Sequence, residues 1–449
     1  MESIVVAVEQ TDRTPLLQCP ATTNSSSAPL AAGGDEISPS PSPPPNCAAD
    51  LSANSSQRRL ASLDVFRGFT VALMILVDDA GGAFPSINHA PWFGVTLADF
   101  VMPFFLFGVG ISVALVFKRT PSKVVATKKV LLRTTNLFLL GLLLQGGYFH
   151  GRNNLTYGVD LDRIRWFGIL QRISIAYLLA ALCEVWLVSN VCVDSTVSYV
   201  KKYYIEWIVA ILLSATYVSL LLGLYVPSWE FEAPGNNSTL PIPFYECSVN
   251  SPDYGPLPEN SPSWCLAPFD PEGLLSSLMA AVTCFAGLHF GHLIVHLKSH
   301  AQRMLLWTST SILLVICGFL VQLIGMPFSK PLYTLSYMFL TTGVSGFLFI
   351  LMYFIVDVQK FKRPFILFQW MGMNALIVYI LAASELFPAF VQGFYWHSPE
   401  NNLVNLTESM FQTIFQSKRW GTLAFVLLEI LFWCLAAGFL HMRGIYIKL

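Results

Sequence analysis

Residues 95–117 read VTLADFVMPFFLFGVGISVALVF and contain one charged side chain, Asp99. A helix of about 20 mainly apolar residues is long enough to cross the hydrocarbon core of a bilayer. The stretch is typical of the whole chain of 449 residues, which is 54% hydrophobic and 12% charged. Soluble domains carry about 25% charged residues. We therefore predict an all-α, polytopic membrane protein.

Apolar runs of similar length recur between charged breaks and predict about ten membrane spans. The predicted spans are residues 65–83, 95–117, 130–149, 167–188, 205–226, 273–297, 304–325, 333–356, 365–390 and 420–440. They make up a predicted transmembrane helical bundle over residues 58–449, in contact with membrane lipid. The net charge is −1 and there is no basic tail, so nothing indicates a nucleic-acid partner.

Residues 1–57 differ from the rest because they are rich in Ser, Pro, Ala and Asn and poor in large apolar residues. Such a composition cannot bury a core, and we expect a disordered tail. It lacks the basic and apolar regions of a secretory signal peptide. Asp12 stands four residues before Leu16 and Leu17, a pattern typical of acidic dileucine signals for lysosomal or vacuolar membranes. The alternative is a disordered tail without a signal, because such short patterns arise by chance.

The basic residues are distributed unevenly between alternating connections. One set of connections contains most of the Lys and Arg residues, including Lys128, Lys201 and Lys360. By the positive-inside rule this side is cytoplasmic, and both termini lie on it. The opposite, luminal or extracellular side contains four N-glycosylation sequons, at Asn154, Asn236, Asn237 and Asn405. Cys247 and Cys265 share a loop on that side, where an oxidising environment permits a disulfide.

Several ionisable or amide side chains fall inside the predicted spans, where a charge is costly and usually faces an interior cavity. Asp64 and Arg67 are three residues apart and share a helix face, so they either pair structurally or serve a function. Arg172 follows Gln171 inside an apolar run and has no carboxylate three or four residues away. It therefore needs an anionic partner from another helix or from a ligand. Asn374 is a further polar residue, in the ninth span.

The connection between the first two spans, SINHAPW at residues 86–92, holds His89 on the predicted luminal side. Asp78 precedes this histidine by eleven residues and Asp99 follows it by ten. A chain that leaves one helix and enters the next can bring these groups together. A carboxylate beside an imidazole orients the ring and favours proton acceptance near neutral pH. The alternatives are an exposed loop histidine without a role and aspartates that cap helix ends.

A second group of histidines, His289, His292, His296 and His300, recurs at three- and four-residue spacing. This spacing places them on one helical face, as in some metal sites. They approach the predicted cytoplasmic end and have no nearby carboxylate, so we interpret them as an interfacial polar stripe and expect no metal. The chain also lacks a phosphate-binding loop, an HExxH motif, a CxxC pair and a GxSxG motif.

Several segments, in order along the chain, resemble one family of membrane acyltransferases. They are LASLDVFRGFTVALMILVDDAGG, NHAPWFGVTLADFVMPFFLFGVGISV, RIRWFGILQRISIAYLLA, FDPEGLLSSLMAAVTCFAGLHFGH, PFSKPLYTLSYMFLTTG and MGMNALIVYI. The resemblance is to the heparan-alpha-glucosaminide N-acetyltransferase family of lysosomal-type membrane enzymes and bacterial relatives, and it covers about residues 58–449. It implies transfer of acetyl from cytosolic acetyl-CoA to the amine of a terminal glucosamine on the luminal side.

The resemblance also implies roles for individual residues. The family's catalytic histidine falls on His89, which would deprotonate the acceptor amine, while Asp78 or Asp99 orients its other nitrogen. Direct transfer and an acetyl-histidine intermediate are both open. The residues expected to bind CoA are Arg172, Gln171, Arg67 and Asn374.

Asp78 departs from the family pattern, which has an asparagine eleven residues before the histidine. An ionised aspartate accepts hydrogen bonds but cannot donate one, which puts the acceptor specificity in doubt. An inactive relative and a transporter or lipid-handling protein are the alternatives to an active enzyme. Family members also carry a luminal domain and a further span ahead of the bundle, which we expect this chain to lack. A homodimer is an open alternative to a monomer.

Overall fold

The computed structural model describes part of the chain in detail. The described residues are 60–90, 93–117, 122–145, 166–188, 196–223, 229–232, 244–247, 273–383, 386–398 and 400–446. Some predicted features lie outside the described residues. They are the tail at 1–57 with its dileucine pair, the sequons at Asn154, Asn236 and Asn237, and Cys265, the predicted disulfide partner of Cys247.

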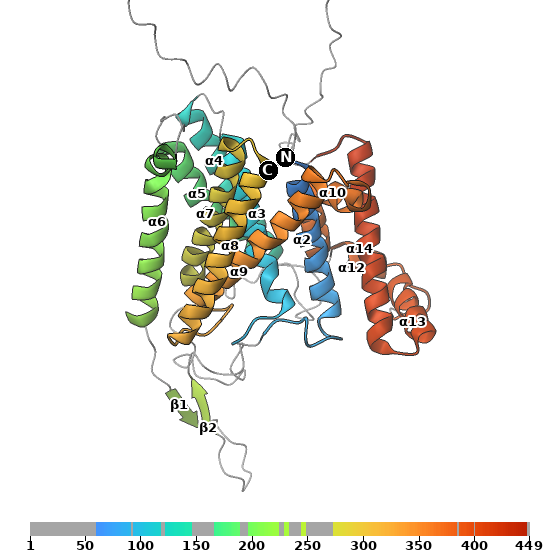
Figure 1. Cartoon of the computed structure of the whole chain (residues 1–449). Helices are drawn as coiled ribbons and strands as arrows, with labels where there is room; N and C mark the ends of the chain where they lie inside the picture. The colour runs from blue at the N-terminus through green and yellow to red at the C-terminus, as the bar shows by residue number, and fades with distance from the viewer. Residues whose placement is uncertain are drawn as a thin grey trace, which may run out of the picture. The chain divides into compact units, whose positions relative to one another are not determined.

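Helices make up nearly all of the described structure (Figure 1). In chain order they are α2 (Ala61–Ala80), α3 (Val101–Phe117), α4 (Lys123–Gln145), α5 (Ile169–Trp186), α6 (Thr196–Gly223), α7 (Leu274–His296), α8 (His300–Leu323), α9 (Leu335–Tyr353), α10 (Ile366–Met373), α11 (Ala375–Ala383), α12 (Leu386–Gln392), α13 (Leu403–Phe415) and α14 (Lys418–Met442). A 3₁₀ turn, Leu97–Phe100, leads into α3.

Two short strands, β1 (Trp229–Glu232) and β2 (Phe244–Cys247), form an antiparallel hairpin with Trp229 opposite Cys247. They lie in the long connection that the sequence places between the fifth and sixth spans. The predicted all-α class therefore describes the helical part of the structure, and this hairpin is a small exception to it.

Seven of the described helical segments are long and apolar enough to cross a membrane, and a bent pair would make eight. They are Leu97–Phe117, Ile169–Trp186, Val197–Leu222, Leu275–His296, His300–Leu323, Leu335–Val358 and Lys418–Met442. These helices make the chain an integral membrane protein, and they account for seven or eight of the about ten predicted spans. α2 and α4 form at the predicted places, yet both carry more charged side chains than these seven segments.

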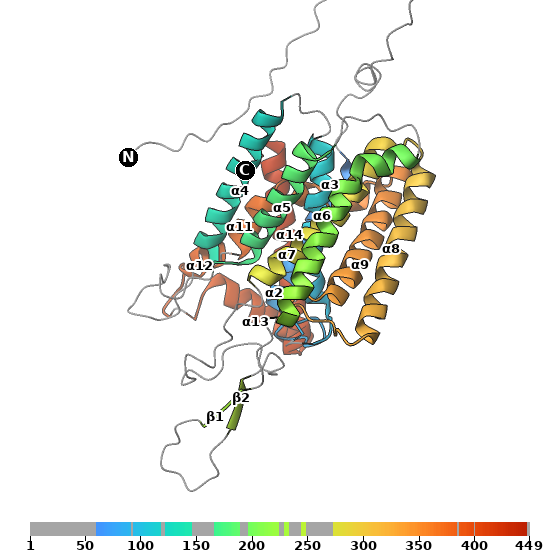
Figure 2. The same ribbon diagram turned by 90° about the vertical axis from the view of Figure 1, so that its left-hand side faces the viewer.

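The interior of the bundle is formed by α3 and α7, whereas α6 lies at its edge, on the left of Figure 1 and at the front of Figure 2. Of the most apolar part of each helix, 67% is buried in α7 and 56% in α3, against 11% in α6. Close packing of α3 on α7 depends on Gly110 and Gly287. A Cβ on Gly110 would collide with the carbonyl oxygen of Cys284, and one on Gly287 with that of Phe107. Small residues allow this approach of two backbones in a membrane bundle.

The ninth predicted span, residues 365–390, is broken at Asn374. The helical segments Arg363–Met373 and Ala375–Ala382 meet there at an angle of 72°. The side chain of Asn374 is 1% exposed, and both atoms of its amide lack a hydrogen-bond partner among the described residues. Broken helices at membrane depth are tolerated where the irregular backbone is buried within the protein.

Candidate active site

The imidazole of His89 and the carboxylate of Asp99 are hydrogen-bonded across the connection between α2 and α3. The Nδ1 atom of His89 lies 2.9 Å from Oδ1 of Asp99. The Asp99 side chain is fully buried, whereas 44% of the His89 side chain is exposed. Because an ionised carboxylate only accepts hydrogen bonds, Nδ1 carries the proton and Nε2 is the nitrogen that can accept one.

The second carboxylate oxygen of Asp99 holds the polypeptide around the histidine. Its Oδ2 atom accepts hydrogen bonds from the backbone N of Thr96 at 2.9 Å, from Thr96 Oγ1 at 3.0 Å and from the backbone N of Ala90 at 3.3 Å. The Thr96 contacts form a capping box at the start of the Leu97–Phe100 turn. Asp99 thus both caps a helix and contacts His89, although these two roles were predicted as alternatives.

Lys330 is a member of the site that the sequence prediction missed. It lies in the connection between α8 and α9, and its Nζ atom is 2.9 Å from Nδ1 and 3.2 Å from Nε2 of His89. An ammonium group only donates, so its contact with Nε2 is the one compatible with the hydrogen bond between Nδ1 and Asp99. The backbone N of Gly94 donates to the carbonyl of Phe328 at 3.0 Å, which ties the two connections together.

A cavity of about 350 Å³ opens beside His89. This volume is within the range of pockets that bind small ligands. Four of the predicted site residues line it, namely Asp78, His89, Gln171 and Arg172. Lys330 and Tyr379 also line it and were not predicted. A signal for Lys330 existed in the sequence, because it is one of the few basic residues on the same predicted side as His89.

Arg172 lies on the wall of the cavity between α5 and α7, and it is 3% exposed. Its Nη1 atom donates to Oγ of Ser276 at 3.3 Å, and its Nε atom donates to the carbonyl of Gly168 at 3.4 Å. Gln171 is 1% exposed beside it. The buried guanidinium of Arg172 and the buried amide of Gln171 therefore line the same cavity as His89.

The two aspartates of the prediction take different positions. Asp99 is the aspartate hydrogen-bonded to His89. Asp78, in the last turn of α2, is exposed at the cavity instead. It is therefore placed to face a ligand.

Arg67 and Asn374, which were predicted to bind CoA, do not line this cavity. Arg67 forms an ion pair with Asp64, with 3.9 Å between Nη1 and Oδ1, and donates a hydrogen bond to Ser112 of α3. The pairing of Asp64 with Arg67 along one helix face agrees with the structural alternative for these residues.

Asn405, the one predicted glycosylation site within the described residues, is exposed in the first turn of α13. This helix was not among the predicted spans, and none of its residues is buried. Trp420, at the start of α14, lies 5.8 Å from the ring of Phe84 in the connection that carries His89. The sequon and the histidine therefore lie at the same end of the bundle.

Residues 59–257 match the family described as heparan-alpha-glucosaminide N-acetyltransferase, catalytic. The matched segment contains His89, Asp99 and Arg172. The chain is similar to this family over the matched segment, which is less than half of its length. It is 25% identical over 409 residues to heparan-alpha-glucosaminide N-acetyltransferase of Homo sapiens, and 25% identical over 415 residues to that of Mus musculus. Each of these alignments covers 84% of the chain.

The resemblance to the heparan-alpha-glucosaminide N-acetyltransferase family that was stated from the sequence is confirmed at this level. The chain spans about 60% of the length of the curated relatives it matches. Lys330 and Asn374 lie beyond the segment that matches the family, although Lys330 contacts His89 inside it.

Proposed function

We propose that the chain is a membrane N-acetyltransferase that transfers acetyl from cytosolic acetyl-CoA to the amine of a luminal amino-sugar with a terminal glucosamine. The observation that carries this proposal is the hydrogen bond between His89 and Asp99, because His89 lines a cavity and both residues lie in the segment that matches an acetyltransferase family. Acetyl-CoA is the donor that this family uses.

In the proposed reaction, the acceptor amine attacks the carbonyl carbon of the acetyl thioester. His89 Nε2 takes the proton that the amine loses and returns it to the CoA sulfur as the C–S bond breaks, which leaves an amide and a free thiol. Asp99 keeps the proton on Nδ1 and stabilises the imidazolium that forms. The Lys330 ammonium lies 3.2 Å from Nε2 in this structure. In the complex with substrate it would move to the carbonyl oxygen, which frees Nε2 to act as the base and stabilises the developing negative charge.

The proposed donor would extend from His89 into the bundle. Arg172 and Gln171 share the cavity with His89, so we assign them to the thioester end of acetyl-CoA instead of its phosphates. Arg67 is eleven residues before Asp78 on α2, which is about 16 Å along a helix. That separation suits Arg67 to the phosphate end of an extended donor. The buried amide of Asn374 would then supply hydrogen bonds between these ends.

The proposed topology places both termini in the cytosol and His89 in the lumen of a lysosomal or vacuolar membrane. This topology is supported by the position of Asn405 and His89 at the same end of the helical bundle. At the start of α2, the backbone N of Ser62 donates to Asp357 at 3.1 Å, which brings the basic segment Lys360–Arg363 to the other end. Glycosidase treatment of the expressed protein tests this topology, because a mobility shift that Asn405→Gln reduces requires a luminal Asn405.

Labelled acetyl-CoA and purified full-length protein test the activity directly. Wild type, His89→Ala and His89→Gln are incubated with a panel of glucosamine-terminated acceptors, and acetylated product is measured by mass spectrometry. We expect product from wild type and at least a 100-fold lower rate from both variants. Equal product yields from wild type and both variants would show that His89 is not catalytic. Failure of the wild-type protein to bind CoA would exclude the proposed acetyltransferase activity.

A transporter is the second candidate function, and the 72° break at Asn374 is the observation that favours it. Discontinuous helices commonly surround substrate sites in secondary transporters. Uptake of labelled glucosamine into proteoliposomes without acetyl-CoA would support transport. Uptake that is absent without acetyl-CoA, together with acetylated product in its presence, would support the acetyltransferase.

A further inference from the structure

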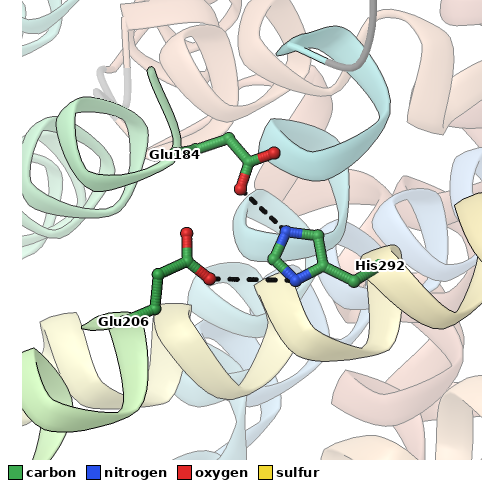
Figure 3. Close-up of side chains that lie close together, drawn as sticks. All are labelled: Glu184, Glu206 and His292. Carbon is green, nitrogen blue, oxygen red and sulfur yellow. Dashed lines mark hydrogen bonds and ion pairs between the residues drawn. The ribbon is translucent and has the colours of Figure 1, made fainter. Parts of the chain in front are cut away.

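His292 of α7 lies between two carboxylates that come from neighbouring helices. Its Nε2 atom is 2.8 Å from Oε2 of Glu184 in α5, and its Nδ1 atom is 3.8 Å from Oε2 of Glu206 in α6. Each glutamate faces a different nitrogen of the ring (Figure 3). The expectation that this row of histidines has no nearby carboxylate is therefore wrong. The carboxylates are distant in sequence and reach His292 only because three helices pack together.

The cluster is buried and incompletely satisfied. His292 is 2% and Glu206 is 7% exposed. The Oε1 atom of Glu206 is buried and has no donor group among the described residues, and the carboxyl groups of Glu206 and Glu184 lie close enough to share a proton or an ion. Burying carboxylates without matching partners is strongly unfavourable. Lys202 attracts Glu184 and offsets part of the negative charge, but it leaves this oxygen of Glu206 unsatisfied.

Aromatic side chains fix the position of the His292 ring. Tyr203 is stacked on it, with 3.8 Å between ring centroids and 18° between ring planes. The hydroxyl of Tyr203 lies 2.8 Å from Nε2 of His296, and that of Tyr199 lies 2.8 Å from Nδ1 of His289. The other two histidines of the row on α7 thus have tyrosine partners, whereas His292 faces the carboxylates.

We infer that Glu184, Glu206 and His292 bind one divalent transition-metal ion, with zinc as the preferred ion. One nitrogen of His292 and one oxygen of each glutamate lie within 4.8 Å of one another. Imidazole nitrogen and carboxylate oxygen are ligands that zinc accepts at about 2.0–2.2 Å. The ion would bind Nε2 beside Glu184, and the Glu206 carboxylate would have to turn from the Nδ1 side toward the ion, which would satisfy its buried oxygen. Three protein ligands leave a fourth position for water.

The metal would act as a structural link between α5, α6 and α7. His292 follows Ser276, the partner of Arg172 at the cavity, by sixteen residues on α7, which is about 24 Å along a helix. The inferred site is therefore remote from the proposed active site. It joins the outer helix α6, of whose most apolar part 11% is buried, to the interior helix α7. Its metal would stabilise the folded protein without contacting the reacting groups.

Metal analysis of the purified full-length chain tests the site. The protein is isolated in detergent on an affinity tag without histidine and in metal-depleted buffers, and zinc, manganese and iron are measured by mass spectrometry. We expect about one ion per chain in wild type and in the control His296→Ala, and at least a 10-fold lower content in Glu206→Gln and His292→Ala. Binding of added Zn²⁺, and the absorption spectrum after replacement by Co²⁺, provide readouts that do not depend on catalysis.

Size-exclusion chromatography establishes whether each variant is folded. If Glu206→Gln or His292→Ala is not folded, the metal content of Glu184→Gln is measured in its place. A chelator should lower the thermal midpoint of wild type and leave that of Glu206→Gln unchanged. Wild type that neither contains an ion nor binds added Zn²⁺ would overturn the inference and identify the cluster as a proton-sharing ion pair. Metal content that the substitutions do not change would overturn it equally. Neither result would affect the proposed acetyl transfer, which is measured separately.

Discussion

At the scale of single residues, the proposed chemistry depends on which nitrogen of His89 carries a proton. Asp99 determines this, because its Oδ1 accepts from Nδ1 while its Oδ2 is held by Thr96 and Ala90. The carboxylate is fully buried and fixed on both oxygens, so it holds the ring without depending on solvent. The exposed face of the ring is left for the acceptor.

Replacement of Asp99 by asparagine keeps the shape of the side chain and removes its charge. We expect kcat to fall by roughly 100-fold or more, because the imidazolium loses its stabilising partner, while KM for acetyl-CoA changes little. Thr96→Val is the matched control, since it removes one hydrogen bond to Asp99 and leaves the carboxylate beside His89. A similar loss of kcat in Thr96→Val would assign the effect to the helix cap instead.

Lys330 provides a second prediction at this scale. Lys330→Met should lower kcat by roughly 100-fold if the ammonium stabilises the oxyanion, as removal of one oxyanion donor does in other enzymes. Lys330→Arg keeps the charge and should retain more activity than Lys330→Met. Steady-state kinetics of the three proteins provide the measurement, and equal kcat in Lys330→Met and wild type would contradict the role.

Asp78 is the residue at which this chain differs from the family pattern. Asp78→Asn introduces an amide that can donate a hydrogen bond at the cavity. We expect kcat/KM for a glucosamine-terminated acceptor to rise relative to that for a simple primary amine. Competition between the two acceptors in one reaction measures this ratio. An unchanged ratio would show that Asp78 does not contact the acceptor.

At the scale of elements, the contact between α3 and α7 places the site. α3 follows directly on the turn that carries Asp99, and α7 carries Ser276, which holds Arg172. Gly110 and Gly287 allow these two backbones to approach closely. A larger side chain at this crossing would move Asp99 and Arg172 apart.

Gly287→Val tests the crossing. The added side chain collides with the backbone of α3, and we expect a loss of roughly 1–3 kcal/mol in stability, as for other overpacked cores. Gly82→Ala is the control, because no atom lies within 4 Å of a Cβ built at Gly82. The thermal midpoints of wild type, Gly287→Val and Gly82→Ala are measured by fluorescence size-exclusion chromatography after heating. Equal midpoints in Gly287→Val and wild type would contradict the close packing.

Most of the helices were predictable from the sequence, because long apolar runs such as 95–117 fold into helices in a membrane whatever their neighbours. The break at Asn374 was not, because no proline marks it and the bend depends on packing around a buried amide. α13 was missed for a related reason. Its apolar residues recur at the spacing of an amphipathic helix and alternate with polar ones, so no long apolar run marks it.

At the scale of the whole molecule, the contacts that were hardest to predict join distant parts of the chain. Asp99 follows His89 by ten residues, and this short separation made their contact a reasonable expectation. Lys330 is 241 residues from His89, and Glu184 is 108 residues from His292. One sequence does not specify which helices are neighbours, so neither pairing could be predicted. The resulting bundle places the histidine–aspartate pair near one end. The glutamate–histidine cluster lies further along α7, where His292 is about 24 Å from Ser276.

Acetyl transfer across a sealed membrane tests the central claim most directly. Proteoliposomes with one orientation of the protein receive labelled acetyl-CoA on the side of the basic connections and a glucosamine-terminated acceptor on the side of His89. We predict labelled acceptor with wild type and at least 100-fold less with His89→Ala. Equal labelling in both proteins, or labelling only when donor and acceptor share one side, would contradict the account.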